Sequence, residues 1–169
     1  MNLVIRNIAR CLLLVLLQVL VLNNIYLGGY ITPYLYILFV LMLPTSLPKP
    51  VTLLIAFATG LTVDMFSNLM GLHAFAATMV AFCRVTFADR ILTRGDSVTI
   101  DTPSVYSVSL SPALFYLLLM LFVYNMAYFL LVYFSFHDML RILLSATLST
   151  LVVGVLSVLY QSIFTPKEY

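Results

Sequence analysis

Hydrophobic residues form six long runs along this chain, separated by short polar or proline-containing segments. The runs cover residues 5–25, 31–47, 50–66, 71–90, 112–134 and 139–164. A helix of about 20 apolar residues is long enough to cross the hydrocarbon core of a bilayer. The pattern therefore predicts an all-α integral membrane protein, with about six transmembrane helices in one domain over residues 1–169.

The second run, 31–47, is short for a span and contains Pro33 and Pro44 near its ends. Together with the third run, 50–66, it could instead form a re-entrant hairpin. Lys49 argues against that alternative, because the tip of such a hairpin would hold a cation inside the membrane without a partner. We therefore expect two separate spans.

Composition supports a membrane protein and limits its chemistry. The chain is 63% hydrophobic and 8% charged, with a net charge of +2 that is too small for a nucleic-acid-binding surface. Cys11 and Cys83 lie in separate apolar runs and are expected to pack as small apolar groups. The sequence has no motif of a hydrolase, metalloprotease, P-loop protein or membrane aspartyl protease. We expect neither an enzyme nor a cofactor or metal site.

Basic residues set the expected orientation, because they favour the cytoplasmic side of a membrane. With six spans, both termini are predicted to be cytoplasmic, and the loops at 23–30, 67–70 and 135–138 to face outward. A longer polar loop is expected at Gly95–Ser111. Only Arg141 then lies near the outside, and the cytoplasmic side receives Arg6, Arg10, Lys49, Arg90, Arg94 and Lys167.

Small residues recur on one face of the third run and on one face of the fourth. On the third run they recur every four residues, at Thr52, Ala56 and Gly60, and Asp64 continues the same face. On the fourth they recur every three or four, at Gly71, Ala74, Ala77, Ala81 and Ala88, and Arg84 lies on the same face. Small side chains let two helix backbones approach closely. The two runs are therefore predicted to pack as a tight hairpin.

Asp64 needs a polar partner, since a carboxylate at the bilayer centre costs about 2.5–3.5 kcal/mol. From the helical rise, Asp64 and Arg84 differ in height by about 10 Å, which disfavours a direct pair. His73 begins the fourth helix at nearly the height of Asp64. We expect Asp64 to contact His73 or backbone amides at the turn. Arg84 is expected to extend toward the cytoplasm or to meet a residue of another helix or subunit.

Two roles for Asp64 remain open: a cap that orders the Ser67–Asn68 turn, or a buried contact that fixes the hairpin or receives a partner. For His73 we favour a structural hydrogen bond over a proton relay. Asn125 is expected to form an interhelical hydrogen bond. Tyr34 and Tyr36 are interpreted as part of an interfacial belt.

The segment 53–82, LLIAFATGLTVDMFSNLMGLHAFAATMVAF, resembles the rod shape-determining protein MreD family. Gly60, Asp64 and Gly71, followed by an alanine-rich helix, carry the resemblance. It implies a fold similar to the substrate-binding subunits of energy-coupling-factor vitamin transporters, and a location in the bacterial inner membrane. His73 and Arg84 go beyond the family pattern.

The resemblance also implies a non-enzymatic role in the elongation machinery that positions peptidoglycan synthesis and regulates cell shape. The implied partners are an MreC-like periplasmic protein, a RodA-like polymerase with its transpeptidase, and an MreB-like filament. No nucleic-acid partner is expected.

The alternative is a substrate-binding subunit of a small-molecule, vitamin-type uptake transporter. Such a subunit needs an outer cavity with converging polar groups. The candidates for that lining are Asn23, Asn24, Asp64, Asn68, His73 and His137.

Overall fold

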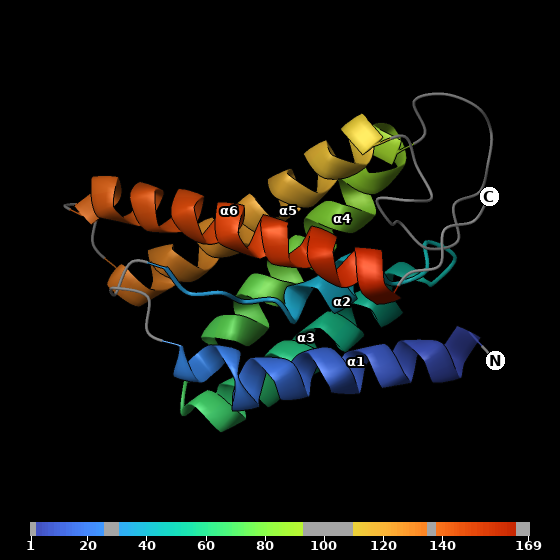
Figure 1. The fold of residues 1–169 in the computed structure, drawn as a ribbon, viewed down its shortest axis with the longest axis horizontal. Helices are drawn as coiled ribbons and strands as arrows, with labels where there is room; N and C mark the ends of the chain where they lie inside the picture. The colour runs from blue at the N-terminus through green and yellow to red at the C-terminus, as the bar shows by residue number, and fades with distance from the viewer. Residues whose placement is uncertain (1–2, 26–30, 93–109, 135–137, 165–169) are drawn as a thin grey trace.

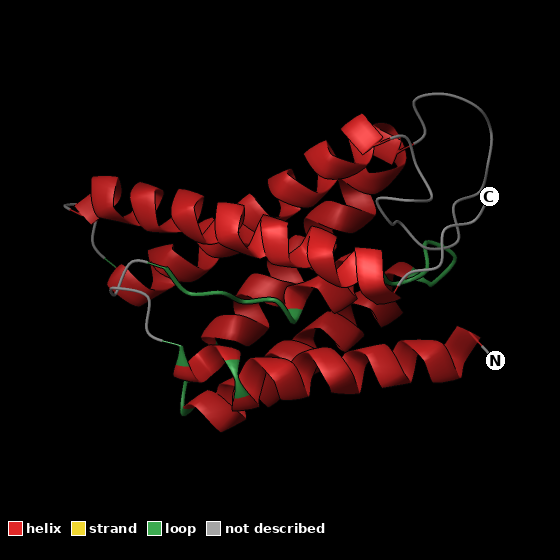
Figure 2. Ribbon diagram, in the orientation of Figure 1, coloured by secondary structure: helices red, strands yellow, loops and turns green. Residues whose placement is uncertain are grey.

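The computed structural model describes residues 3–25, 31–92, 110–134 and 138–164. Every regular element in these ranges is a helix, which confirms the all-α prediction (Figure 2). The elements are α1 (Leu3–Leu20), η1 (Leu22–Asn24), α2 (Ile37–Leu41), α3 (Lys49–Ser67), α4 (Leu72–Leu92), α5 (Leu110–Tyr133) and α6 (Met139–Phe164). The predicted loop at Gly95–Ser111 lies outside the described residues up to position 109.

Four described segments are long and apolar enough to cross a membrane: Ile5–Asn24, Lys49–Ser67, Ser111–Tyr133 and Met139–Phe164. A shorter apolar stretch, Leu72–Thr86, belongs to α4. Large apolar side chains are exposed on the outer faces of these helices, among them Leu54, Phe57 and Leu61 on α3 and Leu144, Leu151 and Val155 on α6. The fold is therefore compatible with a multi-pass membrane protein.

The long helices pack in the order α3, α4, α5, α6, and each runs opposite to the one before it (Figure 1). α1 lies beside α3, and the two helices run in the same direction. Their C-terminal ends meet, since Nδ2 of Asn23, in η1 after α1, donates a 2.8 Å hydrogen bond to Oγ of Ser67 at the end of α3. The bundle thus has two ends. We call them the Asn23 end, where α3 turns into α4, and the Lys49 end, where α3 begins.

The segment 31–47 differs from the predicted span, because its helix, α2, has only five residues. The segment lies inside the bundle, and residues Tyr36–Leu43 are almost fully buried. Side chains of other helices supply some of its backbone hydrogen bonds. The N–H of Leu35 donates to Oε1 of Gln18 at 2.8 Å, and the N–H of Thr32 donates to Oγ of Ser149 at 3.1 Å. Non-helical backbone is stable at membrane depth when protein satisfies it in this way.

The packing of α5 on α6 confirms one prediction. Nδ2 of Asn125 donates a hydrogen bond to Oγ1 of Thr150 at 3.1 Å, which is the expected interhelical contact. A Cβ at Gly154 would lie 2.8 Å from Cδ2 of Leu118, so the two helices are close there. The small residues of α6 are buried in the bundle: Ser145, Ala146, Ser149, Thr150, Gly154 and Ser157.

Candidate functional site

α3 and α4 touch through their backbones at Gly60. A Cβ added there would lie 2.6 Å from Cα of Ala74 and 2.6 Å from the carbonyl oxygen of His73. Only a hydrogen atom fits in that space. Small or polar residues fill the rest of the interface and are buried: Thr52, Ala56 and Asp64 on α3, and Ala77, Ala81 and Arg84 on α4. The predicted tight hairpin is confirmed.

Asp64 binds the first turn of α4 with both carboxylate oxygens. Oδ1 accepts the N–H of His73 at 3.0 Å, and Oδ2 accepts the N–H of Ala74 at 2.8 Å. The first N–H groups of a helix have no partner within the helix, and a negative charge is favourable beside them. Asp64 is 1% exposed, so these bonds are shielded from solvent. The expected contact with backbone amides at the turn is confirmed.

The backbone of Asp64 also organises the end of α3. Its carbonyl oxygen accepts the N–H groups of Asn68 and Leu69, the second at 3.0 Å. Asn68 has a φ of 53°, a left-handed conformation common where a helix ends. One residue thus ends α3 through its backbone and begins α4 through its side chain.

Gly71 has a different role from the predicted one. Its φ is +84°, which glycine adopts at low cost, and a Cβ there would meet no atom within 4 Å. The expectation that Gly71 belongs to the packing face is wrong. The residue serves the chain reversal before α4, where backbone conformation matters and packing space does not.

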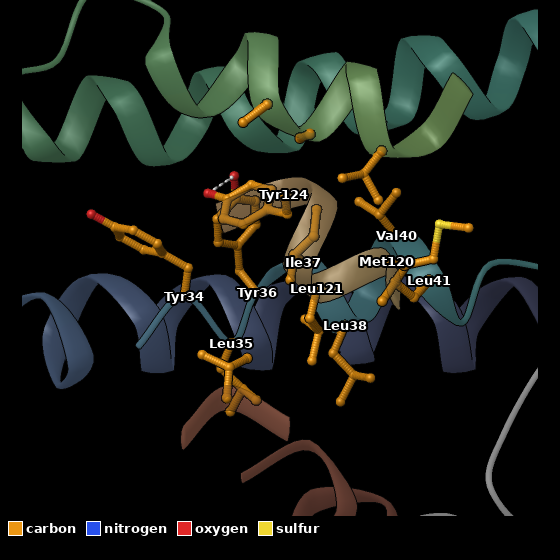
Figure 3. Packing of buried hydrophobic residues seen from close by; sticks show 14 of the residues in the cluster. Tyr34, Leu35, Tyr36, Ile37, Leu38, Val40, Leu41, Met120, Leu121 and Tyr124 are labelled. Atoms are coloured by element: carbon orange, nitrogen blue, oxygen red, sulfur yellow. Dashed lines mark hydrogen bonds between the residues drawn. The ribbon is translucent and has the colours of Figure 1, made fainter. Parts of the chain in front are cut away.

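His73 joins a buried hydrogen-bond chain with two tyrosines. Its Nδ1 lies 2.7 Å from the hydroxyl of Tyr124, which lies 3.0 Å from the hydroxyl of Tyr36. The Tyr36 hydroxyl also donates to the carbonyl oxygen of His73 at 3.4 Å. Figure 3 shows Tyr36 and Tyr124 meeting at their hydroxyl groups. The structural hydrogen bond predicted for His73 is present, and it connects α4 to α5 and to the segment before α2.

Two further aromatic rings enclose His73. Tyr128 stacks on its ring with centroids 4.7 Å apart, and Tyr34 meets it edge-on at 4.5 Å. The interfacial interpretation of Tyr34 and Tyr36 is therefore wrong, since both rings are buried in the bundle. The four-residue spacing of Tyr124 and Tyr128 places them on one helix face, a signal that could have pointed to this cluster.

Arg84 binds the end of α2. Its Nε donates a hydrogen bond to the carbonyl oxygen of Leu41 at 3.3 Å, and Nη2 donates to that of Leu43. Carbonyl groups at a helix C-terminus lack helical partners and attract a cation. Arg84 is 3% exposed and therefore does not extend to solvent. Of the two predicted alternatives for Arg84, contact with another helix is therefore correct and extension toward the cytoplasm is wrong. Asp64 is not its partner, as predicted.

A cavity of about 340 Å³ opens at the Asn23 end, between α1, η1, the segment before α2, and the α3–α4 turn. We call it the polar cavity, because its lining includes the uncharged groups of Gln18, Asn23, Asn24, Thr32, Tyr34, Ser67 and His73. Among the predicted outer candidates, it brings together Asn23, Asn24 and His73. Asp64 and Asn68 do not line it, and His137 lies outside the described residues.

Gln18 is another site residue that sequence reasoning missed. It is 1% exposed, and its amide links the end of α1 to the segment before α2. Its Nε2 donates to Oδ1 of Asn23 at 2.8 Å, while Oε1 accepts the N–H of Leu35. A lone glutamine within the first apolar run was the available signal, since a polar side chain in a membrane helix usually faces protein.

A second cavity, of about 170 Å³, lies at the Lys49 end. We call it the cationic cavity, because Lys49 and Arg84 both line it. Thr45 and Thr52 add hydroxyl groups to the lining.

No family model, curated protein or solved structure matches the chain. Within the described residues, no group of three or more His, Cys, Asp or Glu side chains is placed to hold a metal ion. The resemblance to MreD therefore stays a prediction that rests on the segment 53–82.

Proposed function

We propose that this chain is a non-enzymatic membrane scaffold of the bacterial elongation machinery, similar to MreD, which helps to position peptidoglycan synthesis. The observation that carries the proposal is the α3–α4 joint at Gly60 and Asp64. These residues carry the sequence resemblance, and their contacts go to the chain's own backbone. A carboxylate bonded to two buried amides holds the fold in place and is poorly suited to react.

The proposed partners are an MreC-like periplasmic protein, a RodA-like polymerase with its transpeptidase, and an MreB-like filament. The outer faces of α3 and α6 support such a role, because they present large apolar side chains. Helices of partner proteins pack on such faces within a bilayer. We extend the proposal to a fold like that of the energy-coupling-factor substrate-binding subunits, with α2 as the shortest of the six α-helices.

The proposed location is the bacterial inner membrane, with both termini in the cytoplasm. The distribution of basic residues supports this orientation. Arg6 and Arg10 lie in the first half of α1, toward the Lys49 end, where Lys49 itself is exposed. Arg141 begins α6 at the opposite end. Positive charge gathered at one end is typical of the cytoplasmic side.

Depletion of the chain from the cells that encode it tests the function. We expect cells to lose their rod shape and a tagged chain to recover the elongation proteins from solubilised membranes. Ala58→Leu, at an exposed position of α3, should restore shape and recovery, whereas Gly60→Leu should restore neither. Cells that stay rod-shaped after depletion would contradict the proposal.

The polar cavity favours a second candidate, the substrate-binding subunit of a small-molecule uptake transporter. Its volume of about 340 Å³ lies within the range of small-molecule sites, and its polar groups converge from four segments of the chain. Mass spectrometry of extracts from the purified chain tests this candidate. A small molecule in stoichiometric amount, lost in Asn24→Leu, supports uptake; recovery of elongation proteins without such a molecule supports the scaffold.

A further inference from the structure

The cationic cavity gathers positive charge at one point on the bundle. It lies where the segment after α2 meets the start of α3 and the second half of α4. Lys49 and Arg84 come from different helices, yet both line this volume of about 170 Å³. Two cations that share a cavity repel each other, so the arrangement is more favourable when an anion lies between them.

Arg84 is a buried cation whose hydrogen bonds go to neutral groups. Of the five N–H donors of its guanidinium, two bind the carbonyl oxygens of Leu41 and Leu43. Asp64 and Asp138, whose side chains the structure describes, both lie at the Asn23 end, and the side chain of Asp89 on α4 lies outside the described part of the chain. Carbonyl dipoles offset part of the charge, but a buried charge is best stabilised by a counter-ion.

The start of α3 adds to the positive potential. Lys49 is its first residue and is exposed, and the N-cap residue Pro48 gives no side-chain hydrogen bond to the helix. The macrodipole of a helix of 19 residues is therefore not offset by a cap at this end. Lysine, arginine and a helix N-terminus together are the groups that proteins use to bind phosphate.

The position of the cavity indicates where a phosphate would come from. The membrane-span candidate Lys49–Ser67 begins at Lys49, so the cavity lies at the level where the hydrocarbon core gives way to headgroups. We propose that the cationic cavity binds a phosphate group, supplied by an anionic lipid headgroup or by free phosphate. Arg84 supplies directional N–H donors from within, and Lys49 supplies an ammonium group at the rim. The inference does not depend on the proposed function.

Native mass spectrometry of the chain in nanodiscs tests the inference. The discs contain phosphatidylcholine with a minor fraction of phosphatidylglycerol, and retention of the anionic lipid is compared between variants. Lys49→Gln should lower that retention about fivefold, since one lysine near a membrane surface contributes about 1 kcal/mol. Arg141→Gln is the matched control, because it removes the same charge at the other end and should leave retention unchanged.

A second measurement separates the two sources of phosphate. Inorganic phosphate is added to the delipidated chain in detergent, and thermal unfolding is followed for the wild type and Lys49→Gln. If phosphate stabilises the wild type but not Lys49→Gln, the site binds free phosphate. If the chain retains phosphatidylglycerol selectively and phosphate does not stabilise it, the site binds the lipid. Equal lipid retention in wild type, Lys49→Gln and Arg141→Gln, with no response to phosphate, would overturn the proposal. Lys49 is exposed, so its substitution leaves the contacts of Arg84 with α2 intact.

Discussion

Asp64 and Arg84 are both buried charges, and both bind the backbone at the end of another helix. Asp64 accepts two N–H groups at the start of α4, and Arg84 donates to two carbonyl oxygens at the end of α2. The negative charge of Asp64 lies at a helix N-terminus and the positive charge of Arg84 at a helix C-terminus, and the helix dipole favours both arrangements. They differ in what surrounds them, because Asp64 has both oxygens bonded within the hairpin, whereas Arg84 borders a cavity that also contains Lys49. The acid is therefore an internal anchor, while the cation keeps capacity for a ligand.

The largest effect is expected at the contact that brings Asp64 to α4. Gly60→Leu places a side chain where a Cβ alone would lie 2.6 Å from the backbone of α4, so the two helices must separate. We expect a destabilisation of about 3 kcal/mol or more. Thermal unfolding in detergent measures it, with Ala58→Leu on the exposed face as control. Equal unfolding temperatures for the two variants would contradict the close contact.

The next effect concerns the anchor itself. Asp64→Ala leaves the N–H groups of His73 and Ala74 buried without an acceptor, at a cost of about 2–4 kcal/mol. Asp64→Asn keeps one acceptor oxygen, so its loss of unfolding free energy should be about half of the loss in Asp64→Ala. The order of unfolding temperatures, wild type above Asn above Ala, is the test. An Ala variant as stable as the wild type would show that the two bonds contribute nothing to the fold.

A smaller effect is expected for Arg84→Met. The variant loses two bonds to carbonyl groups but also removes a buried cation, and the two changes partly cancel. We expect a cost of about 1 kcal/mol by the same unfolding measurement, together with weaker phosphatidylglycerol retention. If Arg84→Met destabilises the chain as much as Asp64→Ala, the cation is an anchor of the same kind.

The smallest effect is expected at Gly71, because only backbone conformation is at stake there. Gly71→Ala should cost about 1 kcal/mol, since its φ of +84° is strained for a residue with a Cβ. Gly71→Asn should cost less, because asparagine tolerates positive φ better. Chemical unfolding of the three proteins would measure the difference. A loss as large as that of Gly60→Leu would mean that Gly71 is a packing residue after all.

The helices and the α3–α4 hairpin could be predicted from the sequence, because apolar run length and small-residue spacing report directly on spans and helix packing. Helical rise excluded Arg84 as the partner of Asp64 and left His73 or the backbone amides at the turn, and the second alternative is the one observed. The segment 31–47 could not be predicted, since an apolar run buried by other helices looks the same whether or not it is helical. Its course depends on Gln18 and Ser149, which are far from it in sequence.

The tyrosine cluster escaped prediction for a related reason. Tyr34 and Tyr36 stand beside a polar loop, where aromatic residues commonly mark the membrane interface. Their burial follows from the packing of His73 and Tyr124 against them, which is a tertiary contact that the sequence around Tyr34 and Tyr36 does not indicate. The contacts of Arg84 could not be predicted either. Its partners are backbone carbonyl groups at the end of α2, and the apolar pattern does not show where that short helix lies.

The most direct test of the account is the position of the start of α4 relative to α3. Spin labels at the exposed positions Leu54 and Phe75, with Cys11 and Cys83 replaced by serine, report that distance by pulsed electron paramagnetic resonance. We predict one narrow distance distribution for otherwise wild-type protein in nanodiscs, and a broader one when Asp64→Ala is added. The same narrow distribution in both proteins would show that Asp64 does not hold the two helices together.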